Sequence, residues 1–79
     1  MGTYQRLMIK RELRDAISRL DVKDSIYLAT LLGLNKNKIC VMSGVDASNF
    51  YKYLKTNKGL SSTKQMLILR TIEEVLLQC

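Results

Sequence analysis

Residues 36–55 read KNKICVMSGVDASNFYKYLK, and this stretch decides how the chain folds. It predicts two short helices, at 36–43 and 47–55, with a tight turn between them. Gly44 supplies the positive φ angle that such a turn needs, and Asp46 is a natural N-cap for the second helix. The second helix carries aromatic residues on one side and polar or basic residues on the other. The stretch therefore predicts two crossing helices, the second with an exposed polar face.

The rest of the chain also has helical periodicity. It contains no proline, and its apolar residues predict further helices at 3–20, 22–32 and 63–77. The helix at 3–20 carries many basic side chains. We therefore expect an all-α fold: one domain over residues 1–79, built as a compact bundle of about five helices around the pair at 36–55.

Polar residues mark the expected helix starts. Asp21 and Asn35 precede helices, Thr3 is the expected cap of the first one, and Ser62 with Gln65 has the spacing of a capping box. The side chains expected to face the core include Leu13, Ala16, Ile17, Leu20, Ile26, Leu28, Leu31, Leu32, Ile39, Cys40, Met42, Phe50, Tyr53 and Leu54. The last helix has more apolar residues than one face can hold, including adjacent Ile68 and Leu69. Either a dimer contact or packing against the first helix explains that excess.

The composition argues against several kinds of site. The 79 residues carry a net charge of +6, no histidine, and two cysteines that are far apart, Cys40 and Cys79. No metal-ligand spacing, nucleophile with an adjacent base, or Gly-rich phosphate loop is present, so we expect no enzyme, no cofactor and no metal. No apolar run reaches the roughly 20 residues of a membrane span, and a signal-peptide pattern is missing, so a cytoplasmic protein is expected. The basic charge favours an anionic partner, nucleic acid first.

Two helices that cross closely at a turn need certain residue types at fixed positions. The fifth residue must be small, the ninth is glycine, and the tenth, fifteenth and eighteenth are apolar and hold the second helix against the first. Counted from Lys36, these positions are Cys40, Gly44, Val45, Phe50 and Tyr53. Over roughly residues 22–77 the chain thus resembles the helix-turn-helix family of phage Cro and cI-type repressors. Cysteine at the fifth position and the two aromatics depart from that family's usual choice.

The same five positional requirements are also met when the count starts at another residue, and we call this alternative count the second register. Counted from Ser25, the five positions are Ala29, Gly33, Leu34, Ile39 and Met42. The residues that would face DNA at the sixteenth and seventeenth positions distinguish the registers. They are Cys40 and Val41 in the second register, but Tyr51 and Lys52 in the first. Tyr and Lys reach phosphates or base edges, so the first register is favoured.

The resemblance implies that helix 47–55 reads the DNA major groove. It places contacts at the start and along the outer face of this helix, here Ala47, Ser48, Asn49, Tyr51, Lys52 and Lys55. Ser48 would bond a base edge and Ala47 would touch a thymine methyl, while Lys52 and Lys55 would supply phosphate affinity. Lys36 before the turn and Lys58 after the reading helix would meet the DNA backbone.

These observations predict a small, sequence-specific DNA-binding transcriptional regulator. It is repressor-like, of phage or mobile-element type, and binds double-stranded DNA as a homodimer. The alternative is a helical protein-binding module, such as an anti-CRISPR-type inhibitor or an antitoxin that acts on a host protein. The basic first helix and the apolar last helix motivate that alternative. The operator, the sign of regulation and whether the chain is a fragment of a longer protein stay open.

Overall fold

The computed structural model describes residues 2–77, which fold into five α-helices and a terminal π-helical segment. These are α1 (Thr3–Ser18), α2 (Val22–Leu31), α3 (Lys36–Ser43), α4 (Ala47–Thr56), α5 (Ser62–Ile72) and η1 (Glu73–Leu77). This part of the chain has no strand, so the fold is all-α, as the sequence predicts. The bounds of α3 agree with the expected 36–43, and α4 extends one residue beyond the expected end.

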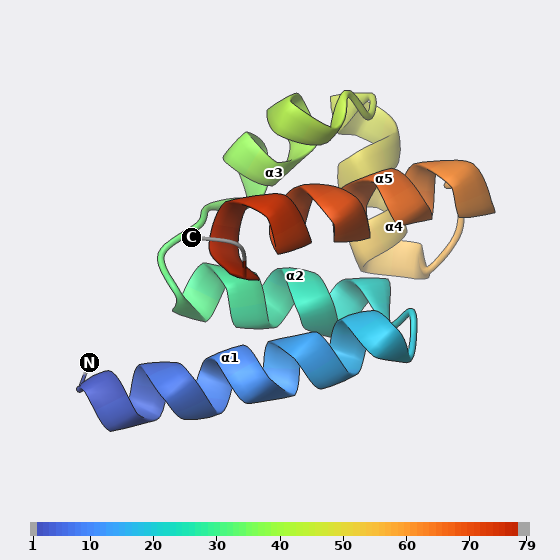
Figure 1. Ribbon diagram of the computed structural model, residues 1–79. Coiled ribbons are helices and arrows are strands. Elements are labelled where there is room, and N and C mark those ends of the chain that lie inside the picture. The colour runs from blue at the N-terminus through green and yellow to red at the C-terminus, as the bar shows by residue number, and fades with distance from the viewer. Residues whose placement is uncertain (1, 78–79) are drawn as a thin grey trace.

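The helices form a bundle with α2 and α5 in its middle (Figure 1). The long α1 lies along α2 on one side, and the pair α3–α4 lies on the other side of α5. The segment η1 packs back against α1. This arrangement places α1 and α3 on opposite sides of α2 and α5, while α4 runs behind α5 toward the start of α2 (Figure 1).

Four of the helices begin at a polar side chain that accepts a backbone N–H hydrogen bond. The pairs are Asp21 with Asp24 N (3.1 Å), Asn35 with Lys38 N (2.7 Å), Asp46 with Asn49 N (3.2 Å) and Ser61 with Lys64 N (3.3 Å). The caps predicted at Asp21, Asn35 and Asp46 are confirmed. The prediction at Ser62 is wrong by one residue, because Gln65 donates to the Leu60 carbonyl (3.0 Å) and no capping box forms there.

The core is contributed by all five helices. Its completely buried side chains are Leu13, Ala16, Ala29, Ile39, Phe50, Ile68 and Ile72, and Ile26 is nearly so. Thr3 is the first residue of α1, and Gly2 takes the cap position in its place. Both Ile68 and Leu69 are buried, since α5 lies in the middle of the bundle.

Three side chains that the sequence assigns to the core are exposed. Leu20 is 58% exposed because α1 ends at Ser18 and Leu20 turns the chain with a φ of +59°. Leu31 is 37% exposed and Met42 is 48% exposed, because each lies on the side of its helix that no other element covers. Helical spacing alone does not show where a helix ends or which of its sides has no other helix packed against it.

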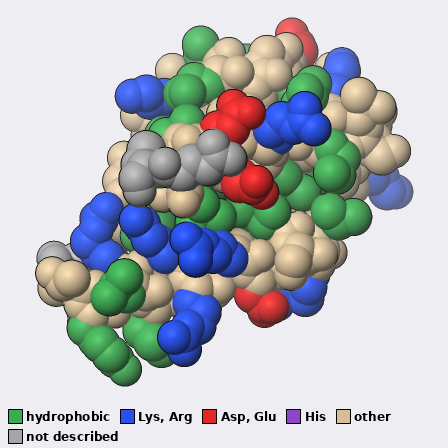
Figure 2. All heavy atoms as spheres, viewed as in Figure 1, with side chains coloured by type: hydrophobic (Ala, Val, Ile, Leu, Met, Phe, Trp, Pro, Cys, Tyr) green, Lys and Arg blue, Asp and Glu red, His purple; other side chains and the backbone are tan. Residues whose placement is uncertain are grey.

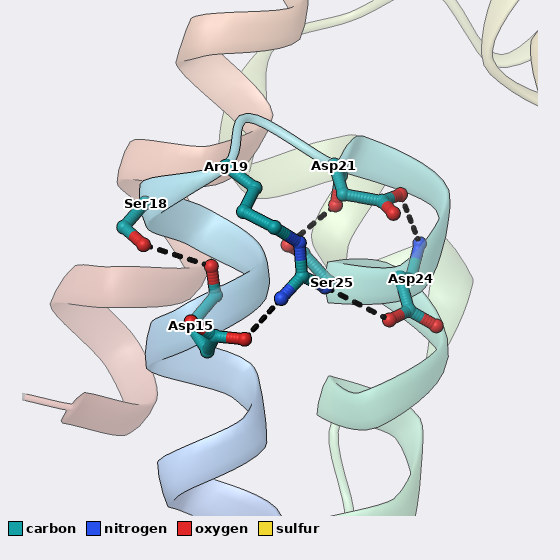
Figure 3. Close-up of polar contacts among 6 residues, drawn as sticks. All are labelled: Asp15, Ser18, Arg19, Asp21, Asp24 and Ser25. Carbon is teal, nitrogen blue, oxygen red and sulfur yellow. Dashed lines mark hydrogen bonds and ion pairs between the residues drawn. The ribbon is translucent and has the colours of Figure 1, made fainter.

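A polar corner joins α1 to α2 (Figure 3). Arg19 at the end of α1 pairs with Asp15 one turn earlier and with Asp24 in α2, the latter at 3.7 Å. Ser25 is fully buried, and its hydroxyl donates to the Asp21 carbonyl at 2.6 Å. The corner thereby satisfies the polar groups at the start of α2 and connects the ends of the two helices.

The expected last helix, 63–77, is divided. Its α-helical part is Ser62–Ile72, and the chain then widens into the π-helical Glu73–Leu77. Because η1 packs against α1, part of the apolar excess is covered within the chain. Met66 and Leu67 are still 49% and 42% exposed, so the dimer contact stays a prediction.

No helix within residues 2–77 combines the length and the apolar character that crossing a bilayer requires.

Candidate functional site

The turn between α3 and α4 has the geometry that the first register requires. Cys40, Val45, Phe50 and Tyr53 are all buried, with Tyr53 the most accessible at 8% exposure. Gly44 adopts a φ of +76° at the end of α3. The Cys40 thiol donates to the Val45 carbonyl at 3.1 Å, which connects α3 to the chain just before α4. The small side chain of Cys40 thus forms a hydrogen bond across the turn, and it also allows α3 and α4 to approach each other closely.

Burial separates the two registers. In the second register Ala29, Leu34 and Ile39 are buried and Gly33 has a φ of +104°, but Met42 is 48% exposed. The same register also requires Cys40 to face outward, and Cys40 is 3% exposed. The burial pattern agrees with the first register at all five positions. It disagrees with the second register at Met42 and Cys40.

The outer face of α4 is a single stripe of exposed side chains. Ser48, Tyr51, Lys52 and Lys55 follow the i, i+3, i+4, i+7 spacing of one helix face, and each is exposed. Ala47 precedes them at the first position of α4 and is also exposed. Asn49 is half-buried, and its backbone N–H is held by the Asp46 cap, so it lies at the edge of this stripe.

Tyr51 lies beside the start of α3. The Tyr51 ring contacts Phe50 edge-to-face, with ring centroids 5.3 Å apart. Tyr51 also closes one side of a surface hollow of about 480 Å³. The other residues of this hollow are Thr30, Gly33, Leu34, Asn35, Lys36 and Asn37. The fold therefore brings Lys36 and Tyr51, two of the predicted site residues, to one place.

Lys52 lies at the opposite edge of α4, toward the loop after it. A Cβ added to Gly59 would lie 3.9 Å from Cδ of Lys52, so the Lys52 side chain passes close to this loop. Lys58 is exposed in the same loop, where its backbone N–H donates to the Thr56 hydroxyl (3.3 Å). The exposed face of α4 is thus flanked by Lys36 on one side and by Lys58 on the other.

The charge of this region is almost entirely positive. Lys36, Lys38, Lys52, Lys55 and Lys58 are exposed, and none of them takes part in either ion pair of the described residues. Asp46 is the only acidic residue between positions 36 and 58, and its carboxylate caps α4. A predominantly positive surface of this kind attracts polyanions.

Sequence reasoning missed the polar residues that line the hollow with Tyr51. Thr30 comes from the end of α2, while Asn35 and Asn37 come from the start of α3. Their position next to Tyr51 depends on how α2 and α4 approach α3, which the spacing within one helix does not encode. The cap predicted at Asn35 was the one signal that placed a helix start there.

Two buried side chains beneath this face have raised pKa values. Burial, followed by the nearby Asp46 carboxylate, raises the pKa of the Cys40 thiol. Burial, followed by the Asp21 carboxylate, raises the pKa of the Tyr53 hydroxyl. Both groups stay neutral at physiological pH and act as structural residues beneath the positive face. Within residues 2–77, no cluster of His, Cys, Asp and Glu side chains could hold a metal ion.

Comparisons with protein-family models, with curated proteins and with solved structures found no match to this chain.

Proposed function

We propose that the protein is a small sequence-specific DNA-binding regulator that presents α4 to the major groove. The observation that carries the proposal is the exposed stripe of Ser48, Tyr51, Lys52 and Lys55 on a helix whose opposite side is anchored by buried Phe50 and Tyr53. A helix of this width and polarity fits the major groove of B-form DNA.

The residues divide into two roles in this proposal. Lys52 and Lys55, with Lys36 and Lys58 on the two flanks, contact phosphates and give sequence-independent affinity. Ser48, the second residue of α4, bonds a base edge. Ala47 offers a methyl group to a thymine methyl, and Asn49 reaches a base or phosphate from the edge of the stripe. Tyr51 and the hollow beside it receive the sugar-phosphate backbone.

The proposal includes a homodimer that binds two half-sites about one helical turn of DNA apart. The exposed Met66 and Leu67 on α5 support it, since adjacent apolar side chains at 49% and 42% exposure gain free energy on burial. Sedimentation of the protein over a range of concentrations tests this part. A monomer at every concentration, alone and on DNA, would contradict the dimer but leave the role of α4 intact. A repressor of phage or mobile-element type is the regulator that a small basic domain with one exposed reading helix fits best.

Titration of fluorescent duplexes at two salt concentrations tests the DNA-binding role. Lys52→Ala is expected to weaken binding to all sequences alike and to reduce the slope of log affinity against log salt by about 1. Ser48→Ala is expected to change the preference among sequences, by about 1 kcal/mol between the best and the altered site. Arg11→Ala on α1 removes the same charge elsewhere and serves as the matched control. Affinity that does not depend on salt would overturn the proposal.

A further inference from the structure

The N-terminal half of α1 exposes apolar side chains that no other element covers. Every residue from position 3 to position 8 is exposed, with Tyr4 at 75%, Leu7 at 61% and Met8 at 40%. These three side chains lie on the side of α1 opposite Leu13 and Ala16, which are completely buried. Figure 1 shows this end of α1 extending past the rest of the bundle. The exposure thus belongs to a projecting helix and is not scattered over the surface.

A basic hollow runs beside these apolar residues. It has a volume of about 300 Å³ and is lined by Leu7, Lys10, Arg11 and Arg14, with no acidic residue among them. Figure 2 shows Lys and Arg side chains gathered over α1, next to apolar side chains at its N-terminal end. Neither ion pair in residues 2–77 involves these three cations, whereas Arg19 at the far end of α1 is paired with two aspartates. Glu73 of η1 lines a neighbouring hollow with Arg14, so Lys10 and Arg11 are the cations of this hollow that lie farther from that carboxylate along α1, and none of the three forms an ion pair within the described residues.

A second, mostly apolar hollow lies on the other flank of the same helix. Tyr4, Gln5, Met8 and Ile9 line it, and its volume is about 360 Å³. One helix half thus offers an apolar flank and a basic flank within two to three turns. A ligand that satisfies both must carry apolar groups and negative charges at similar spacing.

We propose that residues 4–14 of α1 bind an acidic amphipathic segment of a protein partner. Apolar side chains of that segment would cover Tyr4, Leu7 and Met8, and its carboxylates would pair with Lys10, Arg11 and Arg14. This surface lies on α1, on the opposite side of α2 and α5 from α3, so it is separate from the proposed DNA-binding face (Figure 1).

Other occupants fit these observations less well. A DNA backbone would use the cations but leave the three apolar side chains in water. A lipid surface needs a continuous apolar face, and Arg11 lies on that face one turn after Leu7, with Glu12 beside it. A second copy of α1 would bring two sets of unpaired cations together, which costs free energy through like-charge repulsion. An acidic amphipathic segment complements both flanks.

The test uses synthetic peptides and the whole protein. The probe is a fluorescent helical peptide with Leu and Glu at i, i+3, i+4 spacing, and the control peptide carries Gln in place of each Glu. Fluorescence anisotropy is expected to show saturable binding of the Glu peptide and much weaker binding of the Gln peptide. The double variant Lys10→Glu/Arg14→Glu should weaken binding of the Glu peptide by at least about tenfold, because reversed charges repel the carboxylates. Leu7→Ser, at an exposed position, should weaken it without altering the helix content seen by circular dichroism.

The control is the variant Lys52→Glu/Lys55→Glu, which makes the same charge change on α4. It should keep peptide binding and lose duplex binding, whereas the α1 variant should do the reverse. Equal binding of the two peptides, or equal loss of peptide binding in both double variants, would overturn the proposal. Preferential binding to vesicles with phosphatidylglycerol, with no saturable peptide binding, would overturn it in favour of a lipid surface. Loss of duplex binding in the α1 variant would instead assign this surface to DNA.

Discussion

Glycine is required at position 44 because of the backbone conformation there, and not because a larger side chain would clash with its neighbours. Its φ is +76°, and no heavy atom beyond its chain neighbours lies within 4 Å of the position that a Cβ would occupy. Gly44→Ala is therefore expected to lower the free energy of unfolding by about 1–2 kcal/mol through strain alone. Gly44→Asn should cost less, because asparagine tolerates this region, as Asn57 does at the end of α4 with a φ of +64°. Urea unfolding of both variants checks this. Equal stability of the Ala variant and the parent would contradict it.

Cys40 and Tyr53 predict how stability depends on pH. In the folded protein the pKa of Cys40 is raised above its ordinary value of 9.0, and that of Tyr53 above 10.0. As pH rises, the unfolded chain loses these protons first, so ionisation stabilises the unfolded state. The contribution of these groups is fully present below pH 9.0 and is lost progressively as pH rises toward the folded pKa values.

Urea unfolding at a series of pH values from about 7 to about 11 measures this loss. The free energy of unfolding should fall above pH 9.0, and the fall should be smaller in Cys40→Ala and in Tyr53→Phe. If the two variants lose stability over the same pH range as steeply as the parent, other groups are responsible.

At the scale of the helix, Met42 and Phe50 distinguish the two registers. Met42 is 48% exposed, so Met42→Lys is expected to change stability by no more than about 0.5 kcal/mol. Phe50 is completely buried between α4 and the rest of the core, and Phe50→Ala should cost about 3–5 kcal/mol. Thermal unfolding of both variants measures the difference. A large loss in Met42→Lys would show that α3 buries the opposite face and would favour the second register.

Much of the helix layout followed from local chemistry. The bounds of α3 and the caps at Asp21, Asn35 and Asp46 were predictable because a cap bonds within three residues along the chain. The exposure of Leu20 and Met42 was not, because it depends on where α1 ends and on which side of α3 another helix covers. The hollow beside Tyr51 has the same origin, since three separate segments line it.

The change from α-helix to π-helix at Glu73 was also not predictable. Residues 63–77 have continuous helical periodicity, and nothing in them marks an end. The wider turn accompanies the packing of η1 against α1, which is a contact between distant parts of the chain.

Over the whole molecule, basic side chains gather at two separate ends. One set, on α3, α4 and the following loop, includes Lys52 and Lys55, and the other, on α1, includes Arg11 and Arg14. The elements α2 and α5 lie between them (Figure 1). Net charge alone would have both ends attract DNA equally, whereas we assign duplex DNA to α4 and an acidic protein segment to α1. The stripe of Ser48 and Tyr51 has no counterpart on α1, where apolar side chains take its place.

The most direct measurement is an NMR titration of the ¹⁵N-labelled protein with a short random duplex at low salt. We expect the amide signals of Ala47 to Lys55 to shift most, together with those of Lys36 and the loop at Lys58, while the signals of residues 4–14 stay in place. Two results would contradict the claim that α4 is the DNA-binding helix. The first is that the signals of α1 shift most, and the second is that the signals of α4 do not shift when the DNA concentration is high enough to saturate binding.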